Sequence, residues 1–512
     1  MPSILNIAVI GAGTMAQSIH LPLLKRRWDR FAVTALVDHS PRRRRESAEV
    51  WGIGEEQRFE TVGDLIAGVR AKTVKVDAAV LATDGLHVDD LLALMKRGIP
   101  TLVEPPLGYS GAEVERITAF ERVMGRRLVM MAYPQQYDEV VSEVAGEVRA
   151  RDVRMIDHEI LMPAAAPLFG HSHVTAAAYD LPAEARAERR QGLQDAVIAG
   201  SGEAATQRDR DLYVKGLLTG IAHQLAVTER IYGPITRIEA VRHWPKGVIP
   251  GSIELLGELE GGEPVRLVWH YLPFAPQYSE RYEVLSARKR IDLELAPPSF
   301  LDARSSMAVR EKSHGQILTT SHSSALGAAE AMWEAFHAFV DKGEAPLSGA
   351  AEAAAEVALL REVLAAIVGA DGRSLDPEPA DDAEGETEGE SETSTEGVPA
   401  ADPALSPAAA QADAAEASAP SAPVRDAAGT TAASADEPVG TPSEPNALAD
   451  LDPLEIDPSL AVAASDAWSF EVQGDSTVTP LTPEELAEDD LPAPPPAPAE
   501  PAGGSTRAER ED

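Results

Sequence analysis

The first 130 residues alternate between two kinds of hydrophobic pattern. Short, continuous apolar runs predict strands that are buried on both faces. Apolar positions that recur every three or four residues predict helices between them. The predicted strands are residues 7–10, 32–37, 76–82, 101–103 and 128–131, and the predicted helices are residues 16–27, 43–51, 62–69, 88–97 and 111–124. Strand–helix alternation of this kind predicts an α/β domain, residues 1–132, with a doubly wound parallel sheet.

The pattern changes near residue 133. Several of the later apolar runs alternate with polar residues, which is typical of a sheet with one covered face. The predicted strands are residues 153–162, 235–243, 253–260, 265–272, 281–285 and 290–295, and the predicted helices lie near residues 212–232, 326–340 and 350–368. Residues 133–370 are therefore expected to form an α+β domain, in which residues 163–210 are an irregular loop or lid with a short helix.

Composition sets a third segment apart. Residues 371–512 consist mainly of Ala, Pro, Glu, Asp, Ser and Thr, with 34 acidic and 4 basic residues. Such a segment buries too little apolar surface to offset its ordering entropy, so we expect a disordered acidic tail, whose partner the sequence does not identify. The tail holds −30 of the net charge of −38. No basic face remains to displace counterions from a phosphate backbone, and nucleic-acid binding is not expected.

Several residue types and patterns are absent. The chain has no cysteine, which excludes disulfides and thiolate metal sites. No apolar run approaches the roughly 20 residues needed to span a bilayer, and the amino terminus does not resemble a secretory signal. A cytoplasmic protein without a membrane partner is expected. His171 and His173 have no third ligand at a convincing spacing, so no metal site is predicted.

The most informative motif follows the first predicted strand and opens a helix. It consists of Gly11, Ala12, Gly13, Thr14, Met15 and Ala16. Gly11 permits a tight turn, and Gly13 lets the backbone approach a diphosphate without a side chain between them. The free N–H groups of the helix that follows attract phosphate. This pattern predicts a dinucleotide-binding turn.

The choice between NAD and NADP depends on the residues after the second strand. Asp38 lies 22 residues beyond Ala16, where a carboxylate accepts hydrogen bonds from the adenine-ribose hydroxyls and slightly favours NAD. The run Arg42 to Arg45 leaves both cofactors open. One of its guanidinium groups can reach a 2′-phosphate, or the run is the solvated start of a helix.

Further motifs resemble a known family. They are residues 80–87, which end in His87, residues 98–107, which contain Glu104-Pro105-Pro106, residues 134–138, and the helix that carries His223. Together with the glycine turn, they are similar to the glucose–fructose oxidoreductase, inositol dehydrogenase and MocA (Gfo/Idh/MocA) family over residues 4–370.

The resemblance implies a Rossmann domain followed by a domain with an open, largely antiparallel sheet. It implies an NAD(P)-dependent oxidoreductase that acts on a sugar, cyclitol or related polyol, and a homo-oligomer joined through the open sheet face. His223 is then the catalytic acid or base. Glu104 shapes the loop near the nicotinamide, and Thr83 and His87 either lie beside the cofactor or cap their own turn.

Several charged groups that are usual in the family are absent. Pro105 replaces the usual catalytic lysine, Thr219 replaces an aspartate, and Gln135 and Gln136 replace arginines. Lys215 is a candidate for the missing cation, although it can equally be a solvated lysine. Tyr133 and Tyr137 are either proton relays or core residues.

These replacements leave two functions open. The first is an active dehydrogenase or reductase that uses the retained His223. The second is a catalytically weak NAD(P)-binding sensor or partner-binding subunit, because proline at position 105 has no proton to donate.

Overall fold

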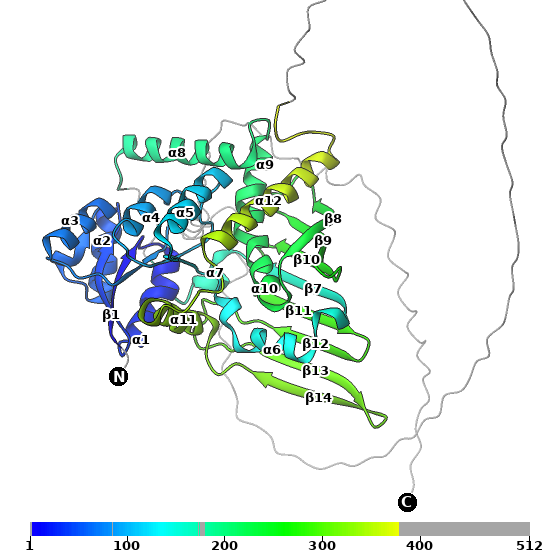
Figure 1. The fold of residues 1–512 in the computed structure, drawn as a ribbon. Coiled ribbons are helices and arrows are strands. Elements are labelled where there is room, and N and C mark those ends of the chain that lie inside the picture. The colour runs from blue at the N-terminus through cyan, green and yellow to red at the C-terminus, as the bar shows by residue number, and fades with distance from the viewer. Residues whose placement is uncertain (1–2, 84, 173, 175–179, 378–512) are drawn as a thin grey trace, which may run out of the picture.

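Two sheets lie side by side in the computed structural model (Figure 1). The structure describes residues 3–83, 85–172, 174 and 180–377. The first sheet has six strands in the order β3-β2-β1-β4-β5-β6, all parallel. Its strands are β1 (Leu5–Ile10), β2 (Phe31–Val37), β3 (Arg58–Phe59), β4 (Ala78–Leu81), β5 (Thr101–Val103) and β6 (Val129–Met131). The predicted doubly wound parallel sheet is confirmed.

The helices between these strands also match the prediction. They are a π-helical turn η1 (Ala16–His20), α1 (Leu21–Arg26), α2 (Pro41–Trp51), α3 (Val62–Ala71), α4 (Val88–Met95) and α5 (Gly111–Met124). Local chemistry fixes the ends of α5. The Ser110 hydroxyl accepts a hydrogen bond from the N–H of Glu113, and Gly125 ends the helix with a φ of 65°.

Alternate residues of β1 point to the two faces of the first sheet. Ile7 and Val9 belong to one buried cluster, and Ala8 and Ile10 belong to another. The first cluster also contains Trp333 of α11 (Ala328–Lys342), a helix from far later in the chain. A segment of the predicted second domain therefore completes the core beneath the dinucleotide turn.

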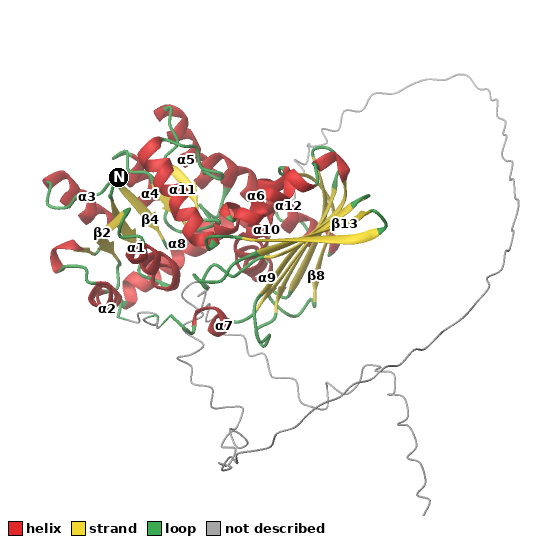
Figure 2. Ribbon diagram, turned by 90° about the horizontal axis from the view of Figure 1, so that it is seen from below, coloured by secondary structure: helices red, strands yellow, loops and turns green. Residues whose placement is uncertain are grey.

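The second sheet has eight strands in the order β14-β13-β12-β11-β7-β10-β9-β8. Neighbouring strands are antiparallel except β10 and β7. The strands are β7 (Val153–Met162), β8 (Ile235–Trp244), β9 (Ser252–Leu259), β10 (Pro264–Tyr271), β11 (Ser279–Ser286), β12 (Lys289–Glu294), β13 (Ser306–Ser313) and β14 (Gln316–Ser323). Helices cover one face, and among the described residues none covers the other (Figure 2). This confirms the expected open, mainly antiparallel sheet.

The remaining helices include α6 (Glu139–Glu147) and α8 (Ala183–Ser201), which the sequence pattern did not predict. The others are α7 (Ala165–Phe169), α9 (Gln207–Leu212), a π-helical segment η5 (Tyr213–Ile221), α10 (Ala222–Tyr232) and α12 (Ala350–Ala370). The expectation of an irregular stretch with one short helix at residues 163–210 was wrong, because α8 alone has 19 residues. Its buried side chains are few, Leu193 and Val197 among them, so its apolar period is weak.

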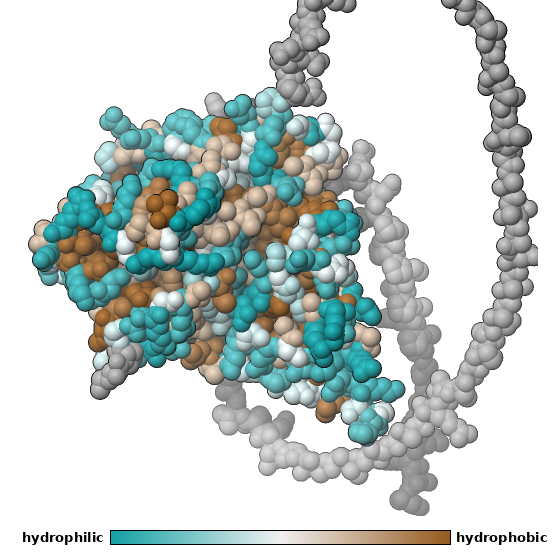
Figure 3. Space-filling view, viewed as in Figure 1, coloured by the Kyte–Doolittle hydropathy of each residue, from teal (hydrophilic) through white to brown (hydrophobic). Residues whose placement is uncertain are grey.

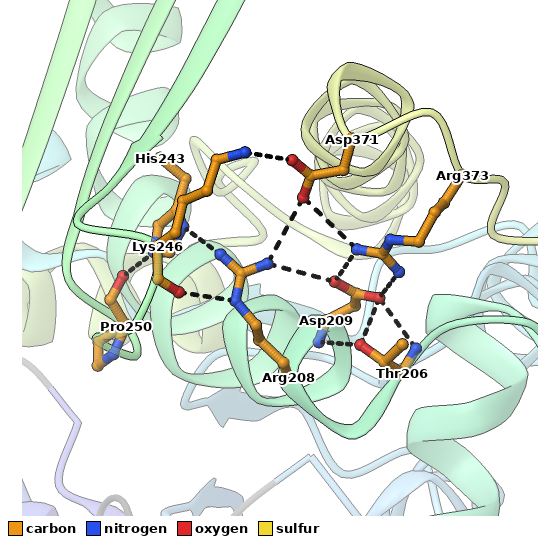
Figure 4. A network of polar contacts seen from close by, with 8 residues as sticks. All are labelled: Thr206, Arg208, Asp209, His243, Lys246, Pro250, Asp371 and Arg373. Atoms are coloured by element: carbon orange, nitrogen blue, oxygen red, sulfur yellow. Dashed lines mark hydrogen bonds and ion pairs between the residues drawn. The ribbon is translucent and has the colours of Figure 1, made fainter.

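A cluster of charges joins the carboxyl end of α12 to α9 (Figure 4). The buried carboxylate of Asp209 accepts hydrogen bonds of 2.6 and 3.0 Å from the guanidinium of Arg373. The Thr206 hydroxyl adds a third bond of 2.6 Å. These bonds outweigh the opposing effect of burial and lower the pKa of Asp209 to about 2.

Residues 371–377, the start of the predicted tail, are thus described and attached, and Leu375 is buried as well. Residues 378–512 lie outside the described part of the chain. Within the described part, no helix is both long and apolar enough to cross a bilayer. On the face drawn in Figure 3, polar and hydrophobic residues are interspersed.

Candidate functional site

The glycine turn has the shape that a diphosphate requires. Gly11 has a φ of 84°, and a Cβ at this position would lie 2.6 Å from the carbonyl oxygen of Ala82. At Gly13 the nearest atom to such a Cβ is a guanidinium nitrogen of Arg43, at 3.8 Å, so the space above this backbone is open. The Thr14 hydroxyl is buried and has no hydrogen-bond partner among the described residues. The orphaned hydroxyl and the open cradle fit a bound dinucleotide.

Asp38 lies beside this turn at the carboxyl end of β2. One carboxylate oxygen accepts a hydrogen bond of 2.8 Å from the N–H of Ala12, and the other accepts one of 2.8 Å from the N–H of Ser40. These two bonds hold the carboxylate against the glycine turn. Its contact with the adenine ribose stays a prediction.

The four arginines after Asp38 all have acidic neighbours. Arg42 pairs with Glu46 at 2.9 Å, Arg43 lies 3.9 Å from Asp38, and Arg44 lies 3.7 Å from Glu60. Arg45 is also near Glu46, at 3.8 Å. Arg43 is the one that overhangs the glycine turn.

Thr83 and His87 meet each other next to the turn. The Thr83 hydroxyl lies 2.9 Å from Nδ1 of His87, and a Cβ on Gly11 would come within 2.7 Å of the Thr83 methyl group. His87 is buried and precedes the first residue of α4. Thr83 thus borders the glycine turn, and its contact with His87 braces their own turn. Contact of either residue with the cofactor stays a prediction.

Glu104 is held by a buried chain of hydrogen bonds that passes through His20, the last residue of η1. Its carboxylate lies 2.7 Å from Nε2 of His20. The indole N–H of Trp333 donates to Nδ1 of the same ring at 3.2 Å. Because Nδ1 accepts, Nε2 carries the proton and donates it to Glu104. This arrangement supports the expectation that Glu104 shapes the loop and leaves proton transfer to another group.

His223 is the second residue of α10, and its ring meets the edge of Tyr133 with centroids 5.2 Å apart. Burial lowers the pKa of the imidazole below 6.5, although the nearby carboxylates of Glu104 and Glu280 oppose the shift. No hydrogen bond from a described residue to this ring is seen. The ring is therefore neutral near pH 7 and can accept a proton.

Glu280, on β11, is a site residue that sequence reasoning missed. It is buried and accepts hydrogen bonds from Tyr278 at 2.5 Å and from Gln135 at 3.2 Å. Nε2 of His158, on β7, lies 3.0 Å from its other oxygen. A register of paired strands brings these groups together, and the sequence pattern alone does not specify that register.

The residues that replace the family's charged groups have structural partners here. The Thr219 hydroxyl donates to the carbonyl oxygens of Val214 and Lys215, one turn earlier, each at 2.9 Å. No hydrogen bond between Thr219 and His223 is seen among the described residues. Gln136 donates to the carbonyl of Ala226 at 2.8 Å. Lys215 lies on η5 and pairs with Asp211 at 3.6 Å, so the structure gives it a local partner. Its role as a replacement cation stays a prediction.

The other predicted positions carry less information. The Tyr137 hydroxyl accepts a hydrogen bond from the N–H of Leu347. Among the described residues, no hydrogen bond joins this hydroxyl to His223. His171 stacks on Phe300 and lies 3.1 Å from the carbonyl oxygen of Ser299, and His173 is outside the described residues. Over the described residues, no group of three metal-ligating side chains is found.

Behind Tyr133 lies a carboxyl group that retains its proton near neutral pH. The Tyr133 hydroxyl donates to Glu356 of α12 at 2.6 Å. Burial raises the pKa of Glu356 to about 8, although the bond from Tyr133 opposes this shift. A neutral acid therefore supports the tyrosine that contacts His223.

The Glu356→Gln variant should be stabilised relative to wild type as pH rises. Between its ordinary pKa of 4.5 and about 8, the folded wild type retains a proton that the unfolded chain releases. Wild-type stability therefore falls over this window, by up to about 1.4 kcal/mol per pH unit, and the amide does not titrate. Urea unfolding at pH 5 and pH 8 measures the difference. Glu362→Gln, on the exposed side of α12, should give none; equal behaviour of the two variants would refute the raised pKa.

The amino-terminal part of the chain matches a family of known proteins. Residues 5–133 match the model of the oxidoreductase family with an NAD-binding Rossmann fold, GFO_IDH_MocA. The chain is 34% identical over 147 residues to an inositol 2-dehydrogenase of Saccharopolyspora erythraea, and 30% identical over 134 residues to one of Gluconacetobacter diazotrophicus. These alignments cover 28% and 26% of this chain, and 41% and 38% of the relatives. The match thus spans about two fifths of their length.

Solved structures extend the likeness to both sheets. A 3-ketoreductase from Actinomadura kijaniata, solved with NADP and TDP-benzene, has a TM-score of 0.52 at 16% identity. A UDP-N-acetylglucosamine 3-dehydrogenase from Acidithiobacillus ferrooxidans has a TM-score of 0.51 at 12% identity. Each comparison covers 71% of this chain and 98% of the other, which shows a shared fold. The amino-terminal domain thus matches the NAD-binding Rossmann model of the Gfo/Idh/MocA oxidoreductase family, and the two-sheet fold is shared with these solved structures.

Proposed function

We propose that this protein is an NAD(P)-dependent oxidoreductase that transfers hydride to or from a CH–OH carbon of a sugar, cyclitol or related polyol. The observation that carries the proposal is the glycine turn, with its open space above Gly13, its orphaned Thr14 hydroxyl and the carboxylate of Asp38 fixed at its side. When bound, NAD(P) supplies the hydride acceptor or donor.

We assign the proton transfer that accompanies hydride transfer to His223. Oxidation of an alcohol releases the hydroxyl proton as the carbon loses its hydride, and a neutral imidazole accepts that proton. Its lowered pKa keeps the ring neutral for this step, and in the reverse direction the imidazolium returns the proton to the carbonyl oxygen. Tyr133 orients the ring by edge contact and is itself fixed by Glu356.

The substrate class rests on the family and on the polar groups near His223. Glu104 and Glu280 both act electrostatically on this ring. Gln135 and Gln136 are neutral where the family resemblance implies arginines. Carboxylates are hydrogen-bond acceptors, which suits a neutral substrate rich in hydroxyl groups better than an anionic one. Polyols and simple sugars are therefore the first compounds to test.

Turnover is tested by following NADH and NADPH absorbance with a panel of inositols, hexoses and amino-polyols, using the full chain. The proposal predicts turnover with at least one compound. Tight dinucleotide binding without turnover on any of them would favour a binding role instead, and absence of dinucleotide binding would refute the proposal.

The Gly13→Val variant should bind the dinucleotide at least about 100-fold more weakly, because the side chain would occupy the space of the diphosphate. Folding should be preserved, since only the mobile end of Arg43 lies within 4 Å of the added Cβ. Quenching or enhancement of NADH fluorescence measures the affinity. Gly111→Ala, in equally open space at the start of α5, is the matched control and should bind normally. Normal binding by Gly13→Val would contradict the site.

A further inference from the structure

The amino-terminal end of α2 already holds an anion from the chain itself. One carboxylate oxygen of Asp180 accepts a hydrogen bond of 2.9 Å from the Ser40 hydroxyl, and the other accepts one of 2.9 Å from the N–H of Arg42. Asp180 lies just before α8, far from α2 in sequence. Although burial opposes the shift, these bonds and the charge of Arg43 lower the pKa of Asp180. The carboxylate is therefore charged at neutral pH.

This contact lies where the two cofactors differ. In the dinucleotide turn, the acidic residue at the end of β2 binds the ribose hydroxyls, and a 2′-phosphate requires a cation close to that residue. Here the acidic residue is Asp38, and its Oδ1 accepts from the N–H of Ser40. A phosphate attached at the 2′ position would extend from Asp38 toward Ser40 and the first N–H groups of α2, beneath Arg43.

Asp180 uses the same donors that a 2′-phosphate would use. Ser40 is the buried N-cap residue of α2. Its hydroxyl donates a hydrogen bond to Asp180 and accepts one from the N–H of Arg43. A phosphate entering this position would lose the Ser40 and Arg42 bonds to a competing carboxylate and would meet its negative charge.

We propose that Asp180 is a specificity residue that fills the 2′-phosphate position and makes the site select NAD(H) over NADP(H). The proposal rests on the proposed dinucleotide function. It adds that a residue from outside the Rossmann domain, and not only Asp38, sets the choice of cofactor. The Asp180 carboxylate at this position leaves the 2′-hydroxyl of NAD free to bind Asp38.

The test compares NADH and NADPH affinities of the full chain by fluorescence titration. Wild type should bind NADH more tightly. Asp180→Asn removes the charge and retains a hydrogen-bond acceptor, whereas Asp180→Ala also vacates the position. We expect the first to improve NADPH binding about tenfold and the second to improve it further, with NADH affinity changed less than about twofold. Glu184→Gln removes one exposed negative charge from the start of α8 and should leave the ratio unchanged.

Three results separate the possible failures. If wild type binds neither dinucleotide, the proposed function itself fails, and the role of Asp180 fails with it. If wild type binds NADPH as tightly as NADH, or if neither Asp180 variant changes the ratio of affinities, the dinucleotide site stands and the specificity role of Asp180 is overturned. A matching change with Glu184→Gln would also overturn it, because the effect would then be one of general charge.

Discussion

The His223→Ala variant is expected to lower kcat by about 10²–10⁴-fold while NADH affinity stays within about threefold of wild type, because the variant loses the proposed general base and retains the glycine turn. His223 is buried and its ring contacts Tyr133. The carboxylates of Glu104 and Glu280 act on it electrostatically. No other described imidazole has this position. Turnover is measured with the substrate found in the panel, and affinity by fluorescence titration.

His322→Ala provides the control, because this ring lies on β14 and pairs with Glu143 at 3.2 Å, away from the glycine turn. Its kcat should equal that of wild type. In the oxidation direction, kcat/KM of wild type should fall only below the ordinary histidine pKa of 6.5, since burial lowers the pKa of His223. Turnover by His223→Ala above one tenth of the wild-type rate would exclude it as the base.

The Arg373→Met variant should lose about 3 kcal/mol of unfolding free energy. The substitution leaves the Asp209 carboxylate buried without its bidentate partner, and removing one member of a buried ion pair is far more costly than removing a surface pair. Arg373 is itself one-third exposed, and Arg208 remains 3.9 Å from Asp209, so the lower end of the usual range is expected. Urea unfolding at pH 7 measures the loss.

Arg361→Met is the matched control, because Arg361 also binds an aspartate, Asp376, with two bonds of 2.7 Å, but both side chains are exposed. It should cost no more than about 1 kcal/mol. The pKa of Asp209 is lowered to about 2, so its stabilising effect is complete above about pH 4 and disappears as pH falls toward 2. The difference between wild type and Arg373→Met should shrink over this window. Equal losses in the two variants would contradict the buried-pair account.

The fold was predictable where the local pattern reflects burial. Thr101–Val103 and Gly111–Met124 were predicted with their observed bounds, because the strand is buried on both faces and the helix has capping residues at both ends. Strand β14 was missed because nearly all of its residues are exposed, so no apolar alternation marks it. Helix α8 was missed because only a few of its residues face the core.

The site residues also fall into those that a local pattern predicts and those that only the tertiary fold brings together. Gly11, Gly13 and Asp38 belong to one local unit of strand, turn, helix and strand, and the spacing of the sequence is enough to find them. Glu280 and Glu356 reach the neighbourhood of His223 through sheet register and helix packing across 57 and 133 residues, which no local pattern encodes. The contact of Asp180 with α2 is equally non-local.

A crystal structure of the protein with bound NADH would show whether the glycine turn and His223 face the same dinucleotide. We expect the diphosphate against the backbone N–H groups that follow Gly13, the adenine ribose on Asp38, and the nicotinamide ring facing His223. Density for the dinucleotide at another place, or a nicotinamide ring turned away from the His223 imidazole, would refute both the binding site and the proposed proton transfer.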